Sequence, residues 1–208
     1  MPLIVMLQIN VIINNPIPSN CYVIYSQDSS KCLVVDPGSE NIREIKYFLN
    51  EKNLLPEYII LTHEHFDHIW SVNKLKNIYL CKIISSRECS ESITDPKKNM
   101  SVFYKPPGFA IDKADVLIDH LGFTMHWNAY KIIFYTTPGH TNGSICFTIS
   151  NYLFTGDTLI NGKETVTRLP GGSKFKLSQS LKLLNSLTKD NTIILSGHGE
   201  SFSYKKLD

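Results

Sequence analysis

The sequence predicts an α/β (α+β) fold of four layers, an αββα sandwich, with a site at the edge between two β-rich lobes. Two observations lead to this prediction. Each half of the chain contains several short strand-like runs and then a helix-like run with apolar residues on one face. Histidine and aspartate residues stand directly after strand-like runs in both halves. Because a sheet buries its apolar face against another layer, two such halves are expected to pack sheet against sheet with helices outside.

The chain length of 208 residues fits one domain with two pseudo-halves, at about 1–115 and 116–208. Its 42% hydrophobic and 19% charged residues are typical of a soluble globular protein. The net charge of +2 comes from scattered lysines and arginines, so neither a nucleic-acid partner nor a membrane partner is expected. We expect a small-molecule substrate, and no feature of the composition specifies an oligomeric state.

Two features favour a cytoplasmic location. The five cysteines show no C-x-x-C spacing, which indicates reduced thiols rather than disulfides or a zinc–thiolate site. The apolar start, residues 1–7, lacks the basic region and the small-residue cleavage site of a signal peptide. It is predicted to be an edge or outer strand.

In the first half, apolar and β-branched runs alternate with segments rich in Asn, Pro, Gly and Ser. Ser39 is placed to cap a helix whose apolar residues, from Ile42 to Leu49, share one face, and Pro56 marks its end. A second helix should start near Asp67. The segment 92–113 contains prolines and little periodicity, which predicts a long surface loop, either functional or disordered. The predicted strands are 6–13, 21–25, 31–36 and 58–61, and the second helix covers 69–75.

The second half has the same character. Short strand-like runs again alternate with turn residues, and one long leucine-rich run has its leucines at helical spacing. The predicted strands are 116–118, 122–126, 131–136, 144–149, 152–154 and 192–195, and the predicted helix is 174–187.

The run from Thr62 to His68 is the most informative part of the sequence. It holds three imidazoles and two carboxylates in seven residues, and it begins where the strand 58–61 should end. The pattern H-x-H-x-D-H supplies side chains that bind metal ions, and few other sites use such a cluster. Neutral imidazole and carboxylate suit Zn²⁺, with iron and manganese as alternatives.

Three further candidate ligands, His140, Asp157 and His198, stand beside glycine just past predicted strands. Glycine lets the backbone turn sharply and bring a side chain from a strand end toward a shared cleft. Five of the seven histidines therefore occupy positions from which one metal site could be assembled.

The H-x-H-x-D-H run followed by His140, Asp157 and His198 resembles the metallo-β-lactamase superfamily. Four shorter runs look like its glyoxalase II (hydroxyacylglutathione hydrolase) branch. Since only residues 201–208 follow the last candidate ligand and its turn, the chain is expected to be a short form without the C-terminal helical domain of that branch. The four runs are Val34-Val35-Asp36-Pro37-Gly38, Thr137-Pro138-Gly139-His140-Thr141, Gly156-Asp157-Thr158-Leu159 and Leu169-Pro170-Gly171-Gly172-Ser173.

The resemblance implies a site for two metal ions with Asp157 bridging them. It also leaves Asp36 with two interpretations: the carboxylate orients a ligand, or Asp-Pro-Gly only makes the turn. Glu64, inside the cluster, is expected to be solvated or bonded to backbone. The implied ligands are His63, His65 and His140 for one ion, and Asp67, His68 and His198 for the other.

The implied activity is hydrolysis of a hydroxyacylglutathione-like thioester, or of a related small acyl ester or lactone, by a metal-bound hydroxide. Asp67 or water would supply the proton to the leaving group. Two alternatives remain open: a mononuclear iron dioxygenase acting on glutathione persulfide, and a metal-binding protein without turnover. Where the short relatives typically read Gly-Arg-Thr-Asp, this chain ends the run in Arg168, which either binds an anionic substrate or is an exposed loop cation.

Overall fold

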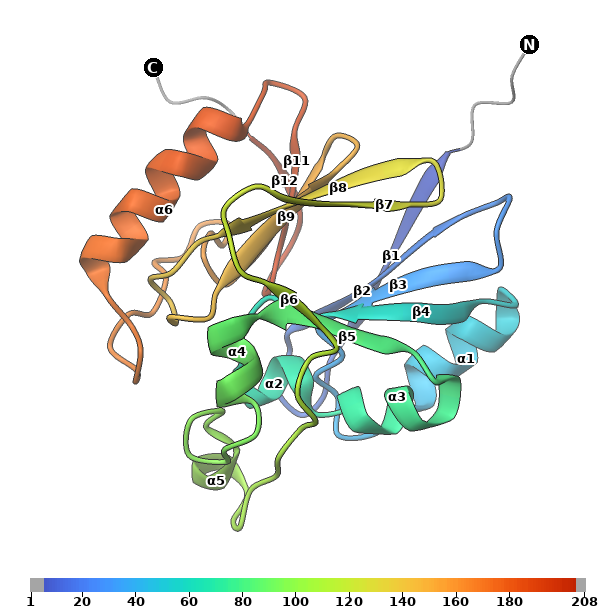
Figure 1. Cartoon of the computed structure of the whole chain (residues 1–208), viewed down its shortest axis with the longest axis horizontal. Helices are drawn as coiled ribbons and strands as arrows, with labels where there is room; N and C mark the ends of the chain where they lie inside the picture. The colour runs from blue at the N-terminus through green and yellow to red at the C-terminus, as the bar shows by residue number, and fades with distance from the viewer. Residues whose placement is uncertain (1–5, 205–208) are drawn as a thin grey trace.

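The computed structural model describes residues 6–204, which form two six-stranded sheets packed face to face with helices on both outer faces (Figure 1). The predicted αββα sandwich is confirmed. The first sheet contains β1 (Leu7–Ile13), β2 (Asn20–Ser26), β3 (Lys31–Val35), β4 (Leu55–Ile60), β5 (Lys82–Ser86) and β6 (Val116–Ile118). The second contains β7 (Phe123–Trp127), β8 (Tyr130–Thr136), β9 (Ile145–Ile149), β10 (Tyr152–Gly156), β11 (Ile193–Ser196) and β12 (Phe202–Ser203).

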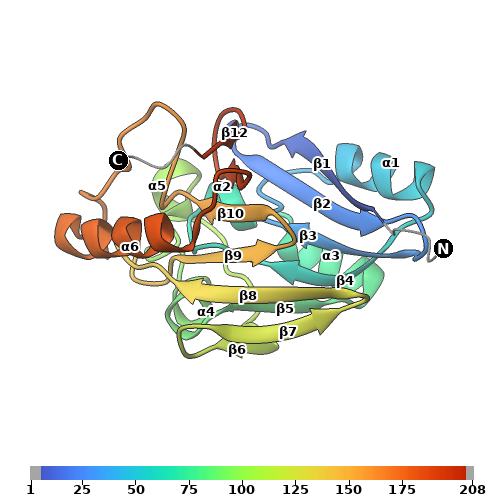
Figure 2. The same ribbon diagram turned by 90° about the horizontal axis from the view of Figure 1, so that it is seen from above.

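The strands follow chain order in both sheets, so the sheets divide between β6 and β7. Strand β6 pairs with β5, which places 116–118 in the first sheet rather than at the start of the second half. The described part of the N-terminal run forms β1 at the edge of this sheet, and residues 1–5 lie outside the described residues. The strand axes of the two sheets are roughly aligned with one another (Figure 2).

Six helices accompany the sheets in the described range 6–204, and none of them is long and apolar enough to cross a bilayer. In Figure 1, α6 covers the second sheet, and α1 and α3 cover the first. The helices are α1 (Arg43–Glu51), α2 (Phe66–Ile69), α3 (Val72–Tyr79), α4 (Arg87–Ser92), α5 (Ser101–Tyr104) and α6 (Lys174–Leu187).

Three details of the predicted elements are wrong. Helix α1 starts at Arg43, whose backbone N–H donates to Asn41 Oδ1 (3.1 Å), so Ser39 is not its cap. The Ser39 hydroxyl instead donates to Asn14 Oδ1 (3.1 Å), because the turn packs against the β1–β2 loop. The helix expected over 69–75 is divided into α2 and α3, and the predicted loop 92–113 contains α5.

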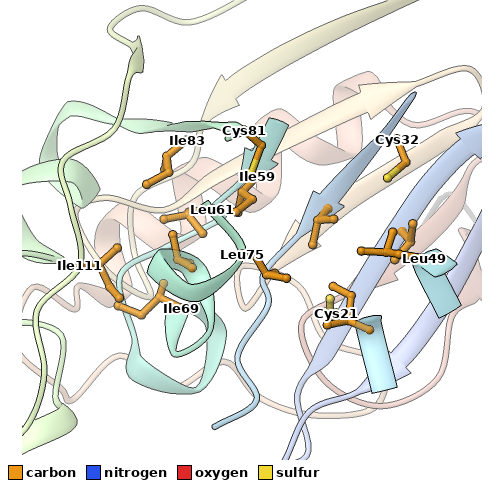
Figure 3. Close-up of a cluster of buried hydrophobic side chains, with 14 of the residues drawn as sticks. Cys21, Cys32, Leu49, Ile59, Leu61, Ile69, Leu75, Cys81, Ile83 and Ile111 are labelled. Carbon is orange, nitrogen blue, oxygen red and sulfur yellow. The ribbon is translucent and has the colours of Figure 1, made fainter. Parts of the chain in front are cut away.

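Apolar side chains fill the spaces between the layers. Between the sheets, Phe147 stacks on Phe154 with ring centroids 4.5 Å apart. Between the first sheet and helices α1 and α3 lies a second cluster, which includes Leu49, Leu61 and Leu75 (Figure 3). Burial of an aliphatic side chain contributes about 1.5–3 kcal/mol, so these clusters hold the two sheets together and hold α1 and α3 against the first sheet.

Parallel strand pairs bring distant parts of the chain to one edge of the sandwich. Strand β3 runs parallel to β4, with Val35 beside Ile60, so both strands end at the same edge. Strand β10 runs parallel to β11, with Gly156 beside Ser196. The residues that follow these four strands therefore emerge together.

Candidate metal centre

Three histidines form the first group of candidate ligands. His63 and His65 lie on the loop after β4, and His140 lies on the loop after β8. One ligand atom from each lies within 4.8 Å of the others, and all three side chains are buried. His65 Nδ1 is 2.9 Å from His140 Nε2. The strand ends thus converge as the sequence predicted for these three residues.

Asp67, His68 and His198 form the second group, with ligand atoms within 4.8 Å of one another. His68 Nε2 lies 3.3 Å from His198 Nε2, and His198 Nε2 lies 3.5 Å from Asp67 Oδ2. Asp67 and His68 belong to α2, which starts directly after the first two histidines. The short helix therefore turns these side chains toward the end of β11.

Asp157 stands between the two groups. Its Oδ2 lies 3.6 Å from His140 Nε2 in the first group and 3.4 Å from His198 Nε2 in the second. Its Oδ1 lies 3.7 Å from His68 Nε2. One carboxylate thus faces ligands of both groups.

The donor atoms fit a bound cation. His63 Nε2 and Asp157 Oδ1 are buried and have no hydrogen-bond partner among residues 6–204. Burying a polar atom without a partner costs about 1–3 kcal/mol, so such atoms are rare in folded proteins. A metal ion would satisfy both atoms, since one offers an imidazole lone pair and the other a carboxylate oxygen.

The two groups differ in electrostatics. Burial lowers the pKa of His63 well below its usual value, lowers that of His65 to about 3, and also lowers that of His140. These three imidazoles are neutral at pH 7, the form that binds metal ions. Burial alone would lower the pKa of His68, but the surrounding carboxylates, led by Asp67, outweigh it and raise that pKa to about 10. The second group therefore favours a positive charge at its centre.

Asp36 supports the second group from behind. It lies just past β3 with a left-handed backbone (φ +48°), which aspartate tolerates better than most residues. Its Oδ2 lies 3.1 Å from His68 Nδ1, while His68 Nε2 faces the other ligands. Thr62 donates its backbone N–H to Asp36 Oδ1 (2.8 Å) and its hydroxyl to Oδ2 (2.6 Å). The contacts favour the orienting role over a turn alone.

The β1–β2 loop and the first residue of β2 also support the site, which sequence reasoning missed. Asn14 donates to the Asp36 carbonyl (3.0 Å), and Ser19 donates to the Asp67 carbonyl (2.5 Å). Asn20 Nδ2 donates to the carbonyls on both sides of the His198 turn, those of Ser196 (2.9 Å) and Gly199 (2.8 Å). The only available signal was that polar residues cluster in a turn between two strands.

Glu64 meets one of its two predicted environments. The side chain is buried rather than solvated, and its carboxylate accepts hydrogen bonds from its own backbone N–H and from the Thr141 hydroxyl (2.8 Å). Burial raises the pKa of this carboxyl. Its contact with the His140 loop joins the two halves beside the first group.

A cavity of about 360 Å³ opens onto the candidate ligands His65, Asp67, His140 and Asp157. Arg168 does not line it. The exposed Arg168 side chain lines a neighbouring cavity, also about 360 Å³, and Val166 lines both. Cys146 is buried in β9, as expected, and does not line either cavity.

Comparison with known proteins agrees with this geometry. The sequence model of the metallo-beta-lactamase superfamily matches residues 14–198. The chain belongs to the metallo-beta-lactamase superfamily. Among superfamily members, it is similar to the "Probable metallo-hydrolase YqgX" of Bacillus subtilis, with 30% identity over 88% of this chain and 86% of that protein.

Two further similarities concern length and fold. A hydroxyacylglutathione hydrolase of Salmonella typhi is 33% identical over 88% of this chain, and the match spans only 64% of the length of that enzyme. Among solved metallo-beta-lactamase folds, the crystal structure of the BLEG-1 B3 metallo-beta-lactamase superposes with a TM-score of 0.88. Identity with it is 28%, and the match covers 94% of both chains.

Proposed function

We propose that the protein is a metal-dependent hydrolase that cleaves a thioester, or a related small acyl ester or lactone. One observation carries this proposal: six ligand-type side chains meet as two groups of three on either side of a seventh, Asp157, beside an open cavity. The similarity to a protein named as a metallo-hydrolase and to hydroxyacylglutathione hydrolases supports hydrolysis and a thioester substrate.

We propose zinc as the metal, two ions per chain, because imidazole and carboxylate suit zinc and no cysteine is needed; all five cysteines lie elsewhere as free buried thiols. Iron and manganese are the alternatives that the same ligands suit. When bound, such a pair of ions lowers the pKa of water toward about 7 and polarises a substrate carbonyl. We assign one ion to His63, His65 and His140, the other to Asp67, His68 and His198, and the shared position to Asp157.

The chain itself orients the ligands and moves protons. Asp36 holds His68 Nδ1 and so directs its Nε2 into the site. Asp67 lines the cavity, and its carboxyl is the group that we place nearest to a leaving group for proton delivery. A thiolate needs little such help, which favours a thioester. Arg168, one cavity further out, would contact an anionic part of the leaving group.

Elemental analysis of purified protein, paired with a substrate panel, tests the proposal. We expect two zinc ions per chain and hydrolysis of at least one thioester, ester or lactone. The panel includes an anionic glutathione thioester and a neutral thioester with the same acyl group, which together test the role of Arg168. Arg168→Ala should raise KM for the glutathione thioester and leave KM for the neutral one unchanged. A single iron per chain with oxygen consumption on a persulfide would contradict the hydrolase and indicate a dioxygenase.

Asp36→Asn is expected to weaken the second metal position selectively. The amide would place N–H groups against His68 Nδ1, which favours the tautomer with hydrogen on Nε2, the atom that should bind metal. Loss of such a partner typically costs about 10- to 100-fold in metal affinity. Competition with a chelator should show that one ion is bound more weakly than in the wild-type protein and that the affinity for the other is unchanged.

Asp115→Asn is the matched control for this substitution. Asp115 also accepts a hydrogen bond from a backbone N–H, that of Ile83 (2.8 Å), but none of the candidate ligands contacts it. The Asp115→Asn variant should lose some free energy of unfolding but keep both metal ions. If Asp36→Asn lowered the affinity for both ions equally, Asp36 would support the loop as a whole and not His68 in particular.

A further inference from the structure

The cavity over the candidate ligands has two chemically different parts. Four of its lining residues belong to the ligand groups: His65, Asp67, His140 and Asp157. All other lining residues are apolar or aromatic, and none is a lysine or an arginine. These are Phe66, Met100, Phe103, Tyr104, Val166 and Leu169.

The aromatic part is built on an anchored segment. Phe66, within α2, stacks on Tyr104 of α5 at 4.8 Å between ring centroids, and its backbone N–H donates to the Asn99 carbonyl (2.9 Å). The side chain of Asn99 is buried and donates to the Phe109 carbonyl (2.8 Å). Phe109 in turn stacks on Trp70 at 5.1 Å. We call the apolar and aromatic lining residues the aromatic wall. Its segment around α5 is therefore held, by ring stacking and a backbone hydrogen bond, against the same helix that carries Asp67 and His68.

The wall leaves much apolar surface in contact with water. Phe103 is 70% exposed, Tyr104 44% and Val166 42%. Met100 has a left-handed backbone (φ +68°) at the start of α5, a conformation that is unfavourable for methionine. Apolar side chains beside a site with convergent polar groups are typical of ligand-binding cavities, where the ligand covers them.

We infer that this cavity binds an apolar acyl group, an unbranched alkyl chain of medium length or an aryl-acetyl group, and not a short hydroxylated one. This inference rests on the proposed hydrolase function. The acyl chain lies along Phe103 and Tyr104 with its carbonyl at the ligand groups. The leaving group extends past Val166 toward Arg168. At about 360 Å³ the cavity is at the small end of the usual range for small-molecule sites, which limits the acyl group to a medium length.

The first test compares thioesters of one neutral thiol, N-acetylcysteamine, that carry acetyl, lactoyl, butanoyl, hexanoyl or phenylacetyl groups. Each added methylene should raise kcat/KM about threefold, mainly through KM, because burial of a methylene from water is favourable. Phe103→Ser should reduce the hexanoyl-to-acetyl ratio about tenfold. Phe175→Ser is the matched control, since Phe175 is 72% exposed on α6 and does not line this cavity. A flat series, or a preference for lactoyl, overturns the inference.

The second test measures binding without turnover. 2-Octanone and hydroxyacetone imitate the acyl part of a thioester and are not hydrolysed, and they can be titrated into metal-loaded and metal-free protein. The methyl NMR signal of Met100, assigned with Met100→Leu, should shift with 2-octanone at concentrations at least tenfold lower than with hydroxyacetone. Phe103→Ser should remove that difference, and Phe175→Ser should keep it.

The two tests separate failure of the inference from failure of the proposed function. Hydrolysis without a preference for apolar acyl groups leaves the hydrolase intact and overturns the acyl-group inference. Absence of hydrolysis across the panel, with selective binding of 2-octanone at Met100, overturns the hydrolase and leaves an apolar ligand cavity. Equal binding of the two ketones overturns the cavity's selectivity, whatever the enzyme does.

Discussion

His63→Ala combined with His65→Ala is expected to strip metal from the protein and abolish hydrolysis. The double change leaves His140 as the last histidine of the first group. It also removes His63 Nε2, one of the buried atoms without a partner that a metal would satisfy. Loss of a residue that only hydrogen-bonds a metal ligand lowers metal affinity about 10- to 100-fold. Loss of two ligands should therefore lower it further. Elemental analysis and the rate on the best substrate of the panel measure both effects.

Stability gives an independent measurement of the same change. A ligand present at a thousand times its Kd stabilises the folded state by about 4 kcal/mol, so a chelator should lower the Tm of the wild-type protein by several degrees. The double variant should melt at a lower temperature that the chelator hardly changes. His120→Ala with His126→Ala serves as the control, because both histidines are exposed. Full metal content and activity in the first double variant would refute the ligand assignment.

Local patterns predicted the elements whose physical causes are local. Helix α6 spans 174–187, as the leucine spacing indicated, because Leu177 and Leu184 recur at the helical period on a buried face. Strand β5 was missed. Its sequence, Lys-Ile-Ile-Ser-Ser, has only two apolar residues, and it is buried because Ile83 packs in the cluster under the helices and Ile84 in the cluster between the sheets. Burial of that kind is decided by tertiary packing and leaves no periodic pattern.

The candidate ligands could be located because they stand in short runs with a distinctive composition: the histidine-rich run that follows β4, and His140, Asp157 and His198, each beside a glycine after a strand. Their supporting contacts could not. Ser19 reaches the carbonyl of Asp67 across 48 positions, and Asn20 reaches that of Ser196 across 176. Such pairs exist because the β1–β2 loop closes the edge where both sheets end. No spacing in one sequence indicates which polar turn residue will lie there.

Gly197→Ala should remove metal from the shared position with only moderate loss of stability. A Cβ at Gly197 would lie 2.2 Å from Asp157 Oδ1 and 2.8 Å from His68 Cε1, so those side chains must move. The backbone cannot easily move away, because the Gly197 N–H donates to the Gly156 carbonyl (2.7 Å) and its carbonyl accepts from the Asn20 N–H (2.7 Å). Overpacking of this kind costs about 1–3 kcal/mol. Metal content, activity and urea unfolding measure the outcome.

Gly199→Ala is the matched control, on the other side of His198. A Cβ there meets nothing within 4 Å, but the backbone is left-handed (φ +76°), so alanine costs about 1–2 kcal/mol through strain alone. Both variants should therefore be destabilised to a similar degree, while only Gly197→Ala loses metal and activity. Loss of metal in both would mean that the site fails whenever this turn is weakened. Retention in both would place Asp157 outside the metal centre, because its carboxylate could then move without consequence.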